Sequence, residues 1–333
     1  MNESFEQLYQ QLSEQHRPQL ETIRKSIVRK LWIAGFLGAA VVVLILWLLP
    51  LGEYIIHIIT SLFIAFFAYK YFLKRPYILY FREHVAKNFV ALVDSSLSYS
   101  PEPPDNWRDR ILVQYRTARF DGRGLGDSTR RMEPADTMGS PGLSNFIAGE
   151  IEGRPFQLCC MSMQATGKND KTKFKGLFVS MKVSKSLNGF IKIERRVRRA
   201  RILGTGFIPK AERRKMDHTA FEREFFVGSN DQVTAMQYLT ADVMELLLNF
   251  KSELIDIQTR FNRNLFPQNP NMIRLDLFWR SDQVSMRIGN KKMFKPTMQD
   301  PMCKDSLACC LSSLAFATRF NQVITKSIKE TAI

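Results

Sequence analysis

The sequence predicts an α+β protein, with an N-terminal transmembrane helical hairpin followed by a cytosolic domain that has an antiparallel sheet and flanking helices. Two apolar runs near the N-terminus predict the hairpin. Short alternating segments, followed by helical patterns, predict the domain. The formal net charge of +16 over 333 residues favours an anionic partner, such as a lipid surface, a nucleic acid or an acidic protein.

Residues 1–30 predict an amphipathic helix on the cytosolic side of a membrane. Its apolar side chains recur near helical spacing; they are Phe5, Leu8, Leu12, Leu20, Ile23 and Ile27. Such a stripe suits a membrane surface, the folded domain or a partner helix, and the spacing does not choose among the three.

Residues 31–75 predict the transmembrane hairpin. Residues 31–49 contain no charge, and about 20 apolar residues in a helix cross the hydrocarbon core of a bilayer. Residues 54–72 form the second crossing, with Lys70 close enough to its end to reach the headgroups. Between the runs, Pro50 ends the first helix and Gly52 allows the reversal.

Charge predicts the orientation of the hairpin. Basic residues precede the first crossing and follow the second, whereas the corner between them carries only Glu53. The basic flanks are Arg24, Lys25, Arg29 and Lys30 on one side and Lys70, Lys74 and Arg75 on the other. Because positive residues stay on the cytoplasmic side, we expect a multi-pass inner-membrane protein with both termini in the cytoplasm.

Residues 76–100 predict a linking helix, and the Pro-rich stretch that follows predicts a boundary before a cytosolic α+β domain of residues 101–333. Within that domain we expect two strands that reverse at Glu152–Pro155, an alternating strand at 172–184 and another at 189–197. A helix with Thr240 as its N-cap follows, then a hairpin that turns at Ser281–Asp282, and a C-terminal helix capped near Asp305.

Catalytic, metal and cofactor motifs are not recognisable in the sequence. The four histidines lack ligand spacing, and the glycines of residues 120–129 lack the Lys-Ser/Thr of a phosphate loop. The adjacent pairs Cys159–Cys160 and Cys309–Cys310 predict buried thiols. We therefore expect no metal and no cofactor, and we favour a non-catalytic protein over an enzyme with an unrecognised site.

The segment 191–217 is the most basic stretch, with ten basic and three acidic residues. Alternating arginines would charge both faces of a strand, so we expect an edge strand or a protruding loop here, not a buried central strand. Aromatic residues are not interleaved in it, which argues against nucleic acid. The candidate anion- or partner-binding residues are Arg195, Arg196, Arg198, Arg199, Arg201, Arg213, Arg214 and Lys215.

Three stretches carry a family resemblance: YSPE at 99–102, FKGLFV at 174–179 and, above all, FEREFFVGSNDQVTAMQYLTADVMELL at 221–247. Over residues 80–325 the chain resembles a family of uncharacterised bacterial two-crossing membrane proteins, known as a domain of unknown function. The resemblance implies a bacterial inner membrane and a LemA-type membrane protein as a partner. It implies no active site.

Two functional readings follow. In the first, the chain is an inner-membrane protein whose cytosolic domain binds a protein partner without catalysis, as an accessory or scaffold component of a membrane complex. In the alternative, a membrane-tethered domain binds anionic lipid or nucleic acid through segment 191–217. The sequence leaves homo-oligomerisation open.

Overall fold

The computed structural model describes residues 2–48, 74–104, 107, 109–110, 142–164, 172–196, 213–261, 275–289 and 302–331. The chain forms two compact units. The first comprises Met1–Phe89 and Phe294–Lys304, and the second comprises Val90–Met293 and Asp305–Ile333.

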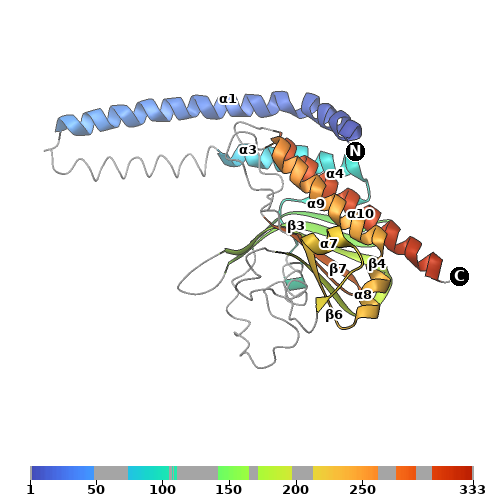
Figure 1. Cartoon of the computed structure of the whole chain (residues 1–333). Coiled ribbons are helices and arrows are strands. Elements are labelled where there is room, and N and C mark those ends of the chain that lie inside the picture. Colours follow the sequence, from blue (N-terminus) through green and yellow to red (C-terminus); the bar gives the residue numbers. More distant parts are fainter. Residues whose placement is uncertain are drawn as a thin grey trace. The chain divides into compact units, whose positions relative to one another are not determined.

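The first unit is built on one long helix, α1 (Asn2–Leu48), which Figure 1 shows in blue. The predicted amphipathic helix and the first predicted crossing are therefore parts of one continuous helix. Four residues of the predicted stripe are buried, namely Phe5, Leu12, Leu20 and Ile27. Residues 49–73, with the predicted corner and the second crossing, lie outside the described residues.

The helical segment after the predicted hairpin contacts α1 and consists of α3 (Lys74–Tyr80), the π-helix η2 (Phe81–Ala86) and α4 (Lys87–Val93). The predicted linking helix of residues 76–100 ends at Val93. Leu97–Ser100 is strand β1 instead, because its backbone pairs with β2 and Leu97 is buried. The second unit thus begins before the Pro-rich stretch.

The second unit contains a seven-stranded antiparallel sheet with the order β1-β2-β3-β4-β6-β5, in which β7 also pairs with β4. The strands after β1 are β2 (Gly142–Ile151), β3 (Arg154–Gln164), β4 (Thr172–Arg195), β5 (Arg213–Arg214), β6 (Phe225–Ser229) and β7 (Leu275–Gly289). The predicted reversal between β2 and β3 is confirmed, since Glu152 and Gly153 both have positive φ, as a tight hairpin turn requires.

Strand β4 is the centre of the sheet because it has different neighbours along its two halves. Its first half pairs with β3 and its last five residues pair with β6, while β7 pairs with both halves. The register with β7 shifts between Lys182 and Phe190. Gly189, at φ +119°, lies in this irregular stretch. The two strands predicted at 172–184 and 189–197 are therefore one bent strand.

The prediction of a hairpin that turns at Ser281–Asp282 is wrong. The chain continues in the same direction as the single strand β7, and both of its halves pair with β4. Ser281 has φ 51° and lies at the register shift, so the polar Ser-Asp pair marks an irregularity in the strand and not a reversal.

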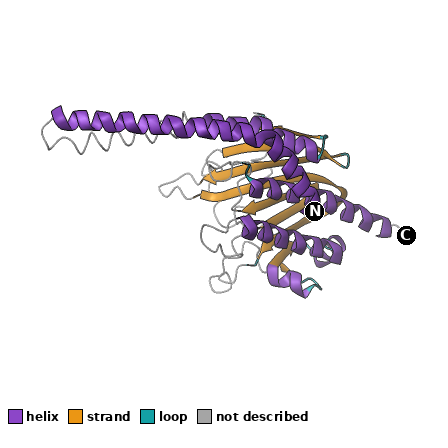
Figure 2. Ribbon diagram, turned by 90° about the horizontal axis from the view of Figure 1, so that it is seen from above, coloured by secondary structure: helices purple, strands orange, loops and turns teal. Residues whose placement is uncertain are grey.

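In the described part of the chain, four helices accompany this sheet: α7 (Thr219–Glu224), α8 (Gln232–Tyr238), α9 (Ala241–Phe261) and α10 (Lys304–Thr331). Helices α9 and α10 lie across one face of the strands (Figures 1 and 2). Phe250 of α9 stacks on Phe316 of α10, with 4.3 Å between the ring centres. Trp279 of β7 contacts Phe320 of α10 edge-on, with 6.0 Å between the ring centres. Met244 N donates to Thr240 O at the predicted start of α9.

The stretch Lys304–Lys326 of α10 is, among the described residues, long and apolar enough to cross a membrane. About two thirds of it is buried inside the fold. Its aromatic side chains contact α9 and β7, so a core helix explains its composition.

A second apolar cluster lies on the other face of the sheet, because neighbouring residues of a strand point to opposite sides. Phe178 belongs to this cluster, whereas the adjacent Leu177 faces the helices. Its buried members are Leu143, Phe146, Cys159, Met161, Phe174, Phe178 and Phe278. Trp107, Ala148 and Phe190 pack against them.

Gly176 tests the close contact between β4 and β7. A Cβ at this position would lie 2.0 Å from the carbonyl oxygen of Ile288, so we expect Gly176→Ala to lower the free energy of unfolding by about 1–3 kcal/mol. In the control Gly142→Ala the nearest atom is 3.7 Å away, and we expect a change within about 0.5 kcal/mol. Thermal unfolding of the two variants makes the comparison, and equal melting temperatures would contradict this account of the contact.

Candidate functional site

The predicted basic residues that the structure describes gather at one corner of the sheet. Arg195 ends β4 and Arg196 follows it, while Arg213 and Arg214 form β5 and Lys215 comes next. Strand β6 lies between the two groups because it pairs with both β4 and β5. The remaining predicted residues, Arg198, Arg199 and Arg201, lie outside the described residues.

Phe226 of β6 organises this corner. The guanidinium of Arg196 lies 4.5 Å from the centre of its ring, and that of Arg213 lies 4.7 Å from the same centre. A guanidinium near an aromatic ring is held by the ring's quadrupole. Arg214 is oriented separately, because its Nη2 donates to the carbonyl oxygen of Asn230 at 2.9 Å. We call Arg196, Arg213 and Phe226 the arginine–phenylalanine cluster.

A group of four buried charged residues lies on the same face of the sheet. Lys192 and Glu194 are each 4% exposed, and Asp276 and Arg287 are each 1% exposed. Lys192 Nζ lies 2.9 Å from Glu194 Oε1, and Arg287 Nε lies 2.6 Å from Asp276 Oδ2. Two charges of each sign compensate one another, which is the condition under which a fold accepts buried ions.

Burial raises the pKa of Glu194, and the nearby Asp276 raises it further, while Lys192 and Arg287 oppose these effects. Asp276 is held from a second direction, since the backbone N–H of Arg195 donates to its Oδ1 at 3.3 Å. This hydrogen bond joins the buried charges to the first residue of the predicted basic run.

Phe226 and the four buried charges were not predicted from the sequence. In Ile191–Glu194, isoleucines alternate with Lys192 and Glu194, which was a readable signal of a strand with one charged face. The segment was predicted to be an edge strand or a loop. That prediction is wrong for residues 191–193, which lie in β4 between β6 and β7. The four ions compensate one another, so the charged face can be buried.

The first unit contains a separate polar cluster around the buried His16 of α1. Asn88 Nδ2 lies 3.1 Å from His16 Nε2, and His16 Nδ1 lies 3.4 Å from the hydroxyl of Tyr80, which donates to Gln19. With Asn88 as donor, Nε2 accepts and the proton of a neutral imidazole sits on Nδ1. Burial lowers the pKa of His16, and the neighbouring His84 lowers it further.

Metal-ligating side chains do not converge in the described part of the chain: no group of three or more His, Cys, Asp or Glu residues there could hold an ion. All five cysteines are free thiols, and all but Cys160 are buried. Burial raises the pKa of the Cys159 thiol and that of the Cys310 thiol. The neighbouring Cys309 and Cys160 raise the pKa of Cys310 further. Such thiols are poor nucleophiles.

A family model described as a protein of unknown function, DUF3137, matches residues 172–267, from the start of β4 to just beyond α9. The match includes the arginine–phenylalanine cluster and two of the three stretches that carry the family resemblance. A search of curated proteins finds no match. A crystal structure of the mycobacterial trehalose monomycolate transport factor A, TtfA, matches with a TM-score of 0.36 and 8% identity over 70% of this chain and 91% of that one. This similarity is below the level that establishes a common fold.

Glu194 predicts a pH dependence of stability. Because its pKa is raised above the ordinary value of 4.5, its contribution to stability is complete below pH 4.5 and is lost as the pH rises through the folded-state pKa. We expect Glu194→Gln to reduce this loss, measured as melting temperature between pH 4 and pH 8. The exposed Glu245→Gln is the control. Identical pH profiles for wild type and Glu194→Gln would contradict the prediction.

His16 predicts the opposite behaviour in the first unit. Since its pKa is lowered in the folded state, its contribution to stability is present above pH 6.5 and is lost as the pH falls from 6.5 through the folded-state pKa. We expect faster hydrogen exchange around His16 at pH 5.5 than at pH 7.5, after correction for the intrinsic exchange rate. His16→Asn should remove this difference; if it leaves the difference intact, another group is responsible.

Proposed function

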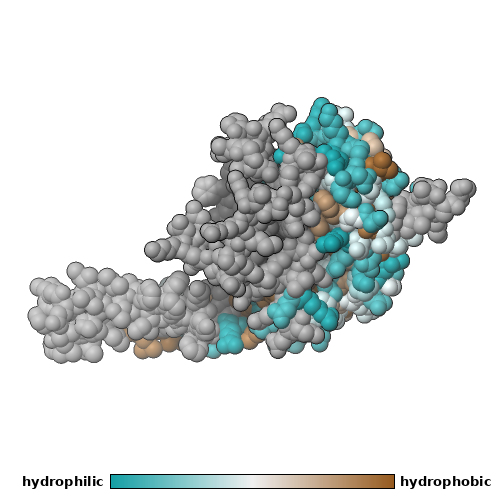
Figure 3. Space-filling view, turned by 90° about the horizontal axis from the view of Figure 1, so that it is seen from below, coloured by the Kyte–Doolittle hydropathy of each residue, from teal (hydrophilic) through white to brown (hydrophobic). Residues whose placement is uncertain are grey.

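We propose that the chain is an integral inner-membrane protein. In this proposal the hairpin 31–72 crosses the bilayer and the second unit is a non-catalytic binding domain in the cytoplasm. The observation that carries the anchor is a strip of large apolar side chains on α1 that are exposed to solvent. Trp32 is 66% exposed and Phe36 is 71% exposed, and their exposed neighbours are Val28, Ile33 and Leu37. Figure 3 shows part of this strip in brown.

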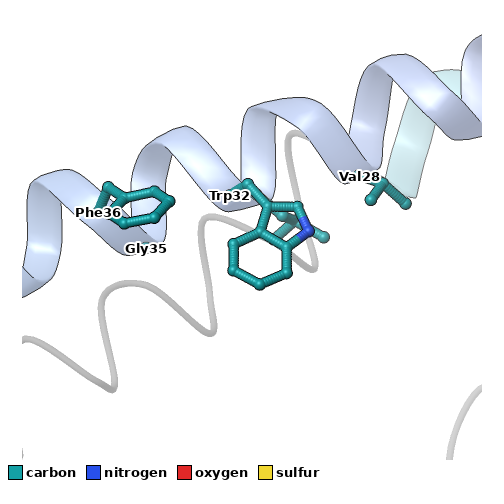
Figure 4. A pocket seen from close by; sticks show the side chains of 5 residues that line it. Val28, Trp32, Gly35 and Phe36 are labelled. Carbon is teal, nitrogen blue, oxygen red and sulfur yellow. The ribbon is translucent and has the colours of Figure 1, made fainter.

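The strip has a hollow that suits an apolar neighbour. Val28, Leu31, Trp32, Gly35 and Phe36 line a depression of about 440 Å³ with mostly apolar walls (Figure 4). Soluble proteins seldom expose a continuous apolar patch of this kind without a partner. Because Arg24, Lys25, Arg29 and Lys30 lie at the N-terminal end of the strip, a bilayer with its cytoplasmic surface on that side is the environment we propose.

For the binding domain, two kinds of partner are proposed. The first is a membrane protein; the family resemblance indicates the LemA type, and crosslinking in membranes followed by identification of the crosslinked band tests it. The second is an anionic ligand, which is favoured by the guanidinium groups that Phe226 holds at the corner of the sheet.

The anchor is tested by extraction of membranes at alkaline pH. Wild-type protein should stay in the membrane pellet. The double variant Phe36→Arg and Leu37→Arg places two charges in the proposed crossing. Insertion of each arginine into the bilayer costs about 2.5–3.5 kcal/mol, so the variant should shift protein to the supernatant. Gln10→Arg with Gln11→Arg adds the same charge at exposed positions outside the crossing and should leave the protein in the pellet. Wild-type protein in the supernatant would overturn the anchor.

The orientation is tested with Thr331→Cys in intact cells. A thiol reagent that cannot cross the inner membrane should label this position only after the membrane is permeabilised, and wild-type protein controls for the five native thiols. Labelling in intact cells would place the C-terminus outside the cytoplasm and contradict the proposed topology.

A further inference from the structure

Two pairs of arginines that are far apart in the sequence meet through the pairing of β4, β6 and β5. Glu194 is opposite Phe226 in the register of β4 and β6, and Arg214 is opposite Val227 in the register of β6 and β5. Residues directly opposite each other point to the same face. Arg196 comes two residues after Glu194, and Arg213 and Phe226 each come one residue before the opposed pair Arg214 and Val227. Because side chains alternate between the faces of a sheet, Arg196, Phe226 and Arg213 lie on one face of this corner. The backbone hydrogen bonds between the strands bring them together.

Phe226 orients the two guanidinium groups, and both of them contact its aromatic ring. Arg196 and Arg213 approach the same ring centre, at 4.5 and 4.7 Å. The N–H donors of a guanidinium lie in its own plane, as a fork that matches the oxygens of a carboxylate or phosphate. Since two cations already lie against this ring, it is a poor platform for stacking a nucleobase.

Arg196 lacks a counter-ion among the residues that the structure describes, although it is half-buried and its Nε is buried. The neighbouring acidic residues are engaged elsewhere. Glu224 forms an ion pair with Lys251, and Glu194 forms one with Lys192. Glu222 accepts a hydrogen bond from the backbone N–H of Met216 at 2.9 Å. Arg196 thus contributes a positive potential that these acidic side chains do not neutralise, beside a second guanidinium on the same ring.

We propose that Arg196 and Arg213 bind a terminal phosphate group, either the monoester of a lipid headgroup or that of a soluble phosphate ester. A phosphate offers several oxygens to in-plane N–H donors from two directions, and guanidinium groups match this geometry better than ammonium groups. The site deepens the anionic-ligand proposal made above. It does not require the membrane anchor, so either proposal can fail alone.

The test uses the full chain in a neutral detergent and isothermal titration calorimetry. The probes are inorganic phosphate, dihexanoyl phosphatidic acid and, as a lipid without a phosphomonoester, dihexanoyl phosphatidylcholine. We expect wild-type protein to bind at least one of the first two more tightly than phosphatidylcholine. Preference for phosphatidic acid over inorganic phosphate identifies a lipid headgroup, and equal binding identifies a soluble phosphate compound.

Variants assign the binding to the cluster. Arg196→Gln and Arg213→Gln should each raise Kd about tenfold or more, since each removes a charge-assisted donor set. Arg196→Lys keeps the charge but loses the planar fork and should give an intermediate Kd. Lys182→Gln removes one positive charge from an exposed ion pair with Asp282 and should leave Kd within about twofold.

Three outcomes overturn the proposal. The first is no binding of either phosphate probe by wild-type protein at 1 mM ligand. The second is an equal loss of affinity in Lys182→Gln and Arg196→Gln, which indicates a diffuse charge effect. The third is tighter, Arg196-dependent binding of single-stranded RNA, which assigns the site to nucleic acid. If Arg196→Gln does not fold, as judged by circular dichroism, Arg213→Gln and Arg196→Lys decide the question.

Discussion

The pairing of β4 with β7 is the constraint on which the second unit depends. One edge of β4 is shared in turn by β3 and β6, whereas β7 pairs with both halves of β4 on either side of the register shift. This long ladder brings Trp279 and Phe320 together on the helical face and Phe178 and Phe278 on the other. It also places Lys192 opposite Phe278. The two apolar layers and the buried ions share this one backbone framework.

The sequence predicted the parts of the fold that local patterns decide. Alternation identified β2, β3 and the first half of β4, and the Glu152–Gly153 turn was correctly located. Thr240 marked the start of α9. Two elements were misassigned because tertiary pairing overrode a local signal. Leu97 falls within the predicted linking helix of residues 76–100 but lies in β1, where its backbone pairs with β2. Ser281 and Asp282 have the composition of a turn but occupy an irregularity within β7.

The candidate site was predictable in composition but not in geometry. The basic character of residues 191–217 was visible in the sequence, and the residues that the structure describes do meet at one corner. The role of Phe226 could not be foreseen, since it depends on β6 lying between two segments that are far apart in the chain. The buried ions were missed for a related reason. Asp276 and Arg287 are eleven residues apart in β7, and only the folded strand brings their side chains into an ion pair.

The π-helix η2 has a consequence for how this segment tolerates insertions and deletions. A π-helix contains an additional residue in its turn relative to an α-helix. A residue added to a regular α-helix rotates everything before it by roughly 100° relative to everything after it, whereas the wider turn of a π-helix takes up the additional residue and cancels most of this rotation. Tyr80 and Asn88, which flank η2, therefore both reach the same imidazole of His16 in spite of the additional residue. The six residues Phe81–Ala86 can thus carry a one-residue insertion without losing the enclosure of this histidine.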